Sequence, residues 1–182
     1  MNNSFFKENI KPALVLLCIC LAATLALAAT HAVTQPLIDQ NAIKAANEAR
    51  ALVLPAGDDY KAVSTGELIE GVDECSIAGN GAGMTVTSHA KGFGGDVKIM
   101  VGIDAKGEIT GVTVTEHAET PGLGTKDMTE EYLSQYKGVK EAPAAHINDD
   151  ANIDAITGAT ITANAIYGGV HLALEQYAEV SK

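Results

Sequence analysis

The chain has 182 residues, of which 47% are hydrophobic and only 4% aromatic, with no tryptophan. This length supports one domain of ordinary size with or without a membrane anchor, and the hydrophobic share excludes a disordered chain. The formal net charge of −11 and the lack of any Lys and Arg cluster argue against a nucleic-acid-binding protein, because a phosphate backbone requires a basic face.

An apolar segment near the N-terminus predicts a transmembrane helix over residues 13–33. No charged side chain occurs between Lys11 and Asp39, and this stretch is long enough to cross the hydrocarbon layer of a membrane. Lys7 and Lys11 precede the segment, so the positive-inside rule places residues 1–12 in the cytoplasm and the rest of the chain on the extracytoplasmic side. We therefore expect a single-pass protein of the cell membrane, with a cleaved signal peptide as the alternative.

Residues 34–60 are predicted to form a stalk or packing helix. Small and apolar side chains recur at helical spacing over residues 36–54, and Thr34 is placed to cap the beginning of that helix. Pro55 and Gly57 are typical of the end of a helix.

Residues 61–182 are predicted to form one exported domain of the α+β class, with a small antiparallel sheet and packed helices. Residues 73–83 are rich in glycine and turn formers, which indicates a loop. Alternation of apolar and polar residues then predicts an antiparallel meander, and a helical period returns near the C-terminus. The predicted elements are strands over 84–91, 96–104 and 108–117, a short helix near 128–136 and a final helix over 162–180.

Two short segments of this domain contain groups that suit a ligand. Residues 154–162, DAITGATIT, place the hydroxyls of Thr157 and Thr160 around a small Gly-Ala pair, where a helix N-terminus favours an anion. Residues 119–124, ETPGLG, offer backbone N–H groups without bulk, which suits contact with a flat ring or a phosphate. Each segment alone is also explained as a helix cap or an ordinary turn.

The cysteines and histidines do not indicate a metal site or a disulfide framework. Cys18 and Cys20 lie within the apolar run, which leaves Cys75 alone in the exported domain without a CxxC motif. The histidines show no metal-ligand spacing, so the sequence predicts no metal site.

Together the two segments resemble the family of covalent FMN-binding domains. The pattern DxxTGAT, from Asp154 to Thr160, resembles the flavinylation motif of that family, and HxETPGLG, from His117 to Gly124, resembles its flavin-facing loop. Residues 91–97, KGFGGDV, resemble the sequence before its central hairpin. Within the family the chain resembles the G subunit of the Rnf electron-transport complex, with the homologous C subunit of the sodium-translocating NADH:quinone reductase as the alternative.

The resemblance implies that FMN is attached to Thr160 through a phosphodiester, installed by a separate flavin transferase. Asp154 and Thr157 are then recognised by the transferase or hold the turn, and Thr162 caps the helix. Glu119 and Thr120 are expected to tune the flavin potential. The predicted cofactor-binding residues are Asp154, Thr157, Gly158, Ala159, Thr160, Thr162, Glu119, Thr120, Pro121, Gly122, Leu123, Gly124 and Lys126.

A covalent link agrees with the charge of this chain. An acidic domain without a cluster of cationic side chains is poorly suited to hold free FMN by its phosphate, and a tether keeps the flavin at high effective concentration beside its pocket. Lys126 is placed to contact the phosphate, although it is equally explained as a solvated surface residue.

The resemblance implies electron transfer rather than substrate chemistry. The chain is then a redox subunit of an ion-translocating ferredoxin:NAD oxidoreductase, without catalytic residues and not catalytic on its own. Its expected partners are the other membrane and peripheral subunits of the Rnf complex and, during maturation, the flavin transferase. A non-redox exported binding or scaffold module and a free-standing flavoprotein reductase are the alternatives.

Overall fold

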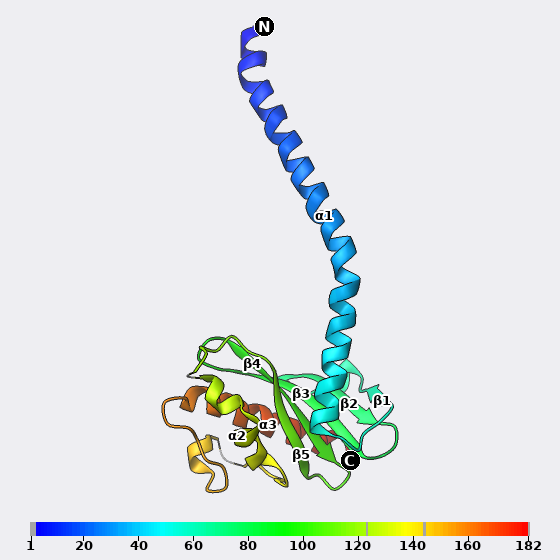
Figure 1. The fold of residues 1–182 in the computed structure, drawn as a ribbon, viewed down its shortest axis with the longest axis vertical. Coiled ribbons are helices and arrows are strands. Elements are labelled where there is room, and N and C mark those ends of the chain that lie inside the picture. Colours follow the sequence, from blue (N-terminus) through cyan, green and yellow to red (C-terminus); the bar gives the residue numbers. More distant parts are fainter. Residues whose placement is uncertain (1–2, 123, 144, 182) are drawn as a thin grey trace. The chain divides into compact units, whose positions relative to one another are not determined.

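The computed structural model describes residues 3–122, 124–143 and 145–181, and the chain divides into two units, Met1–Ala45 and Ala46–Lys182 (Figure 1). The first unit is helical throughout its described part and belongs to α1 (Asn3–Val53), whose side chains from residue 10 to 34 are all exposed. The stretch Ile10–Val53 has a mean hydropathy of 2.5 in its most apolar window, so by length and composition it can span a membrane.

The predicted beginning of a separate helix at Thr34 is wrong. α1 continues through Pro36, and the Thr34 hydroxyl donates to the Thr30 carbonyl at 3.0 Å, one turn earlier in the same helix, instead of capping a new one. Pro36 lies inside α1 and removes one backbone N–H donor from the helix, and this single loss does not end it. α1 ends at Val53, beside Pro55 as predicted.

The second unit contains one five-stranded antiparallel sheet in the order β1-β2-β3-β4-β5, so the predicted α+β class and the meander are confirmed. The five strands are β1 (Tyr60–Ala62), β2 (Val72–Ala78), β3 (Gly83–Lys91), β4 (Asp96–Asp104) and β5 (Ile109–Glu116).

The predicted loop over residues 73–83 is wrong in its first half, which β2 occupies. Cys75 is buried and pairs with Val86 of β3, and Ala78 at the end of β2 is buried as well. The glycines that suggested a loop form the turn between Ala78 and β3. Small side chains in β2 pack closely against the core, which a hydropathy pattern does not reveal.

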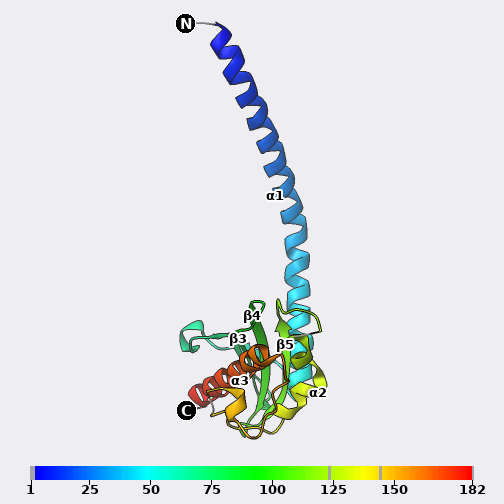
Figure 2. The ribbon, with the colours of Figure 1, turned by 90° about the vertical axis from the view of Figure 1, so that its left-hand side faces the viewer.

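Both faces of strand β4, which lies between β3 and β5, are covered (Figure 2). Val97 and Ile99 belong to the main core with side chains of α3 (Thr160–Val180), whereas Met100 packs with Ala49 and Val53 from the end of α1. Full burial of such side chains stabilises a fold by about 1.5–3 kcal/mol each. The sheet therefore lies between two helices and forms a rigid base.

Two paired glycines allow the end of α1 to approach the sheet. Gly102 of β4 lies opposite Gly111 of β5, and a Cβ atom on Gly102 would lie 2.2 Å from the Val53 carbonyl oxygen. The Thr110 hydroxyl donates to that same oxygen. Without side chains at this pair the helix end and the strands are in direct backbone contact.

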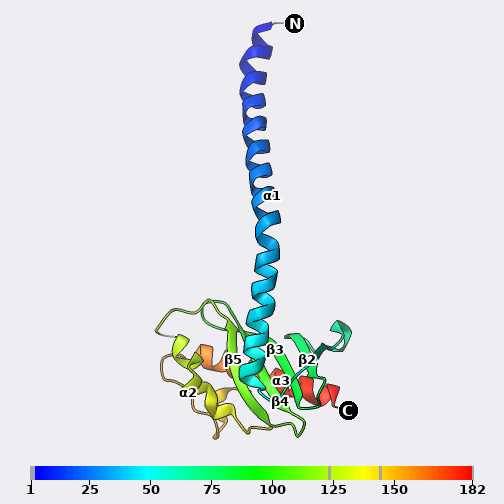
Figure 3. The ribbon, with the colours of Figure 1, turned by 45° about the vertical axis from the view of Figure 1, so that its right-hand side comes forward.

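The short helix predicted near 128–136 is present over residues 130–136, as one α-helical turn followed directly by a 3-10 turn, with a further 3-10 turn before it. These are η2 (Gly124–Met128), α2 (Glu130–Leu133) and η3 (Ser134–Tyr136), and α2 and η3 pack beside β5 (Figure 3). Thr129 separates the first two, because its hydroxyl accepts from the Tyr132 N–H and caps α2.

The final helix α3 begins at Thr160, two residues before the range predicted for it. The residue that precedes it is Ala159, and Gly158 turns the chain there with φ +91°. Thr162 therefore lies buried in the first turn, so the prediction that it caps the helix is wrong.

The glycines Gly168 and Gly169 in α3 provide a matched test of the helix–sheet contact. A Cβ atom on Gly169 would lie 2.6 Å from Ile99 Cδ1, and the Gly169 carbonyl accepts from the Ser88 hydroxyl at 2.7 Å. A Cβ atom on Gly168 would meet nothing within 4 Å.

We predict that Gly168→Ala stabilises the domain by about 1 kcal/mol, because alanine is the better helix former. Gly169→Ala gains the same propensity but overpacks the core, which typically costs about 1–3 kcal/mol. Urea unfolding of both variants measures the difference. Equal stability of the two variants would show that α3 does not pack against the sheet at this point.

Candidate functional site

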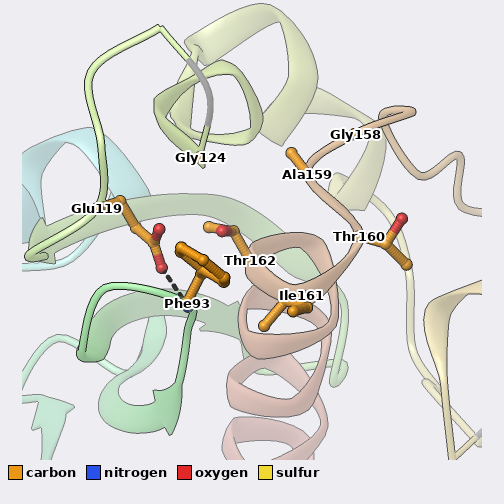
Figure 4. Close-up of a pocket in the computed structure, with 8 residues that line it drawn as sticks. All are labelled: Phe93, Glu119, Gly124, Gly158, Ala159, Thr160, Ile161 and Thr162. Atoms are coloured by element: carbon orange, nitrogen blue, oxygen red, sulfur yellow. Dashed lines mark hydrogen bonds between the residues drawn. The ribbon is translucent and has the colours of Figure 1, made fainter.

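A cavity of about 260 Å³ lies where three segments that are distant in the sequence meet (Figure 4). The segments are the β3–β4 turn, the loop after β5 and the beginning of α3, and these three segments carry the resemblance to covalent FMN-binding domains. Their lining residues are Phe93, Glu119, Gly124, Gly158, Ala159, Thr160, Ile161 and Thr162.

Glu119 joins two of these segments. Its side chain is only 6% exposed, and Oε1 accepts from the N–H groups of Phe93 at 2.7 Å and Gly94 at 3.2 Å. Hydrogen bonds from main-chain N–H groups to a carboxylate are charge-assisted and therefore strong. The loop after β5 is in this way fixed to the β3–β4 turn.

Two glycines make room for this carboxylate. A Cβ atom on Gly92 would lie 2.2 Å from Glu119 Oε1, and a Cβ on Gly124 would lie 2.6 Å from Oε2. The same position at Gly124 is 2.9 Å from Thr162 Oγ1, so the loop and the first turn of α3 also meet here. Any larger residue at either glycine would displace Glu119.

The beginning of α3 presents the N–H groups of its first turn beside a hydroxyl. Within the described part of the chain no side chain caps the helix, because Ala159 at the cap position has no side-chain acceptor, and Thr160 is the first helical residue. The first N–H groups of a helix have no partner within it and favour an anion. The Thr160 hydroxyl points away from Glu119 and Phe93 in Figure 4, while Thr162 points toward them.

The mouth of the cavity is apolar. Phe93 is 69% exposed and Ile161 is 53% exposed, and both line the cavity from opposite segments. Large apolar side chains beside a concave site, with a few polar groups inside it, are typical of a small-molecule site. Neither residue is predicted from the sequence, although Phe93 stands out there as an aromatic residue between glycines.

The other predicted residues do not line this cavity. Asp154 and Thr157 are exposed, and the backbone of Asp154 is held by the side chain of Gln135, whose Oε1 accepts from its N–H at 2.7 Å. The other predicted cofactor-binding residues that do not line the cavity are all exposed in the described part of the chain: Thr120, Pro121, Gly122 and Lys126. Leu123 lies outside the described residues.

The turn η2, which begins at the lining residue Gly124, contains a buried carboxyl group that the sequence pattern does not predict. Asp127 in η2 is fully buried, and neither of its carboxyl oxygens has a hydrogen-bond partner among the described residues. Burial, and then the charge of Glu119, raise the pKa of Asp127 to about 6, while Lys126 opposes that shift. In the sequence Asp127 follows a lysine, a pattern typical of a solvated surface.

Comparison with known proteins identifies the family. The model of the FMN-binding domain family matches residues 92–175, which include all the lining residues. The chain is 32% identical to the G subunit of the Na(+)-translocating ferredoxin:NAD(+) oxidoreductase complex of Acetobacterium woodii, over 97% of this chain and 95% of the relative. It is 28% identical to the G subunit of the proton-translocating ferredoxin:NAD(+) oxidoreductase complex of Clostridium ljungdahlii, over 86% and 85% of the two chains.

One further relative and one solved structure are also similar to this chain. The G subunit of the ion-translocating oxidoreductase complex of Methanosarcina acetivorans is 29% identical over 93% of this chain and 94% of its own. The solved structure is the C subunit of the Na(+)-translocating NADH-quinone reductase of Parabacteroides distasonis, which is 20% identical over 61% of this chain and 62% of that one, with a TM-score of 0.47. The chain therefore belongs to the family of G subunits of ion-translocating oxidoreductase complexes and carries an FMN-binding domain.

Proposed function

We propose that this chain is an electron-transfer subunit that carries FMN, attached covalently at Thr160, in an ion-translocating ferredoxin:NAD(+) oxidoreductase complex of the cell membrane. The observation that carries the proposal is that one cavity is lined by residues of all three segments that resemble the flavin-binding family. When bound, FMN accepts and donates one or two electrons, and the protein sets its potential by hydrogen bonds and charge.

The position of Thr160 suits an esterified phosphate. Its hydroxyl belongs to the first residue of α3, whose first turn has no capping side chain. A phosphate at this point would accept from the free N–H groups and would be stabilised by the helix dipole. The helix thus supplies the positive potential that the side chains around the cavity lack.

A covalent bond explains how an acidic domain retains FMN. No Lys or Arg lines the cavity among the described residues, and Lys126 in the adjacent turn is exposed. Phosphate groups are ordinarily held by such cations. A tether replaces this affinity with effective concentration. Asp154 and Thr157, which are exposed on the loop before Thr160, are available to a flavin transferase.

The cavity is small for a whole flavin. Its volume of about 260 Å³ is below the roughly 300–1,000 Å³ of pockets that enclose a whole ligand. Gly124 and Gly158 add no side chain to its wall, and Phe93 would offer an aromatic face for stacking. A flavin held here would stay partly open to solvent, which would permit electron exchange with a neighbouring protein of the complex.

The names of the relatives and the apolar helix α1 support the proposed setting. The relatives are named as subunits of multi-subunit translocating complexes, one with sodium and one with protons. We propose that this chain belongs to the same kind of assembly, where its flavin is one carrier in the electron-transfer path and the chain is not catalytic on its own. We place its flavin domain on the extracytoplasmic side, because Lys7 and Lys11 precede the apolar part of α1.

We predict that Thr160→Ala abolishes covalent flavin, because it removes the only hydroxyl of that side chain. The full chain, produced together with a flavin transferase, is run on a denaturing gel and its flavin fluorescence is recorded. Thr160→Ser keeps the hydroxyl and should retain a fluorescent band. A fluorescent band from Thr160→Ala would place the attachment at another residue.

We predict that Glu119→Gln raises the flavin potential, because a negative charge beside the cavity disfavours an added electron. A change of about 1.4 kcal/mol, which is that of one pKa unit, corresponds to about 30 mV for a two-electron couple. Glutamine keeps an oxygen that accepts from the Phe93 N–H. Redox titration of the flavin measures the shift, with Glu131→Gln on the exposed face of α2 as the control. An unchanged potential in Glu119→Gln would remove Glu119 from the tuning of the flavin.

A further inference from the structure

Asp127 occupies a place where a charged carboxylate is costly. It is fully buried, and both its oxygens lack a partner among the described residues, although buried polar groups are almost always hydrogen-bonded. An orphaned carboxylate of this kind lowers its cost by binding a proton. The fold therefore holds at Asp127 a group whose charge depends on its neighbours.

The neighbour that matters is the flavin pocket. Asp127 belongs to η2, which begins at Gly124, and Gly124 both lines the cavity and lies against Glu119. The negative charge of Glu119 acts directly on Asp127. Any further negative charge placed in the cavity would act on it with the same sign.

The remaining groups around Asp127 are cationic or neutral. Lys126 in the same turn is exposed and favours the charged form. The hydroxyl oxygens of Tyr132 in α2 and Tyr136 in η3 are buried, and this burial raises the pKa of both, with the charge of Asp127 adding to the shift. Tyr136 is in turn influenced by Tyr167 of α3. These tyrosines stay neutral at physiological pH, so within the described part of the chain Glu119 and Lys126 are the charges that act on the carboxyl group.

We propose that Asp127, in the turn that begins at the lining residue Gly124, is a proton acceptor for the flavin pocket, an inference that rests on the function proposed above. Its carboxylate binds one proton from solvent when one electron from a low-potential one-electron donor enters the pocket, and it becomes a neutral carboxylic acid. The proton returns to solvent when the electron leaves. One positive charge thus accompanies one negative charge, and the net charge of the buried site does not change.

This coupling has a defined dependence on pH. In the chain without flavin the pKa of Asp127 is about 6, and a negative charge added in the pocket raises it further. Below that pH the group is already neutral and cannot respond. Above it, electron entry and proton binding strengthen each other by the same factor, as linkage requires.

The test compares Asp127→Asn with the wild type in the full chain carrying its flavin in detergent micelles. Midpoint potentials are measured from pH 5 to pH 8.5 with dithionite as the reductant. The two potentials should coincide at pH 5 and separate as the pH rises above about 6, with the wild type lower. For a one-electron step, the difference between the two midpoint potentials reaches about 59 mV for each tenfold decrease that reduction causes in the acid dissociation constant of Asp127.

Asp149→Asn is the matched control, because Asp149 is an exposed aspartate in another turn, and its potentials should follow the wild type at every pH. Potentials of Asp127→Asn that equal those of the wild type throughout, or that differ by a constant amount from pH 5 upward, would overturn the proposal. A chain without flavin would instead contradict the proposed function.

A second measurement does not depend on the variant folding. Infrared difference spectra of the wild type with ¹³C-labelled aspartate, recorded at pH 7.5 on reduction, should show one protonated carboxyl band appearing. In the flavin-free chain the same band should be present at pH 5 and absent at pH 8. A band that is insensitive to pH or to reduction would overturn the proton-acceptor role.

Discussion

The buried carboxylate of Glu119 is the interaction on which the site depends. It accepts hydrogen bonds from the N–H groups of Phe93 and Gly94, and these bonds hold the loop after β5 against the β3–β4 turn. Gly92 and Gly124 leave the space that this requires, and Gly124 also contacts the first turn of α3. Without this carboxylate three segments would end near one another without forming a common wall.

The sheet beneath the site explains how such a wall can be rigid. β4 is covered by α3 on one face and by the end of α1 on the other, and the backbone contact at Gly102 fixes the second of these. A site on such a base is held in place, and the proposed attachment would join the cofactor to it through one flexible side chain. A rigid pocket with a flexible tether of this kind would suit the proposed electron carrier, which must both hold a flavin and exchange electrons.

Sequence patterns predict what is local and fail where distant segments meet. The strands from β3 to β5 are predictable from strict alternation, and the segment around Thr160 is predictable from its motif. β2 escapes prediction because its short side chains adjoin a glycine-rich turn. Asp127 escapes it because its burial depends on tertiary packing and not on a local pattern. The contact between Phe93 and Glu119 escapes it because these residues are 26 positions apart in the sequence. No periodicity contains such contacts.

Peptide mass spectrometry of the chain isolated from its native membranes tests the covalent flavin most directly. Attachment at Thr160 predicts that the peptide containing this residue is heavier by FMN less one water and that fragmentation locates the adduct at this threonine. An unmodified peptide at full occupancy, or flavin that leaves the protein when it is denatured, would contradict the claim that the beginning of α3 holds a covalent flavin.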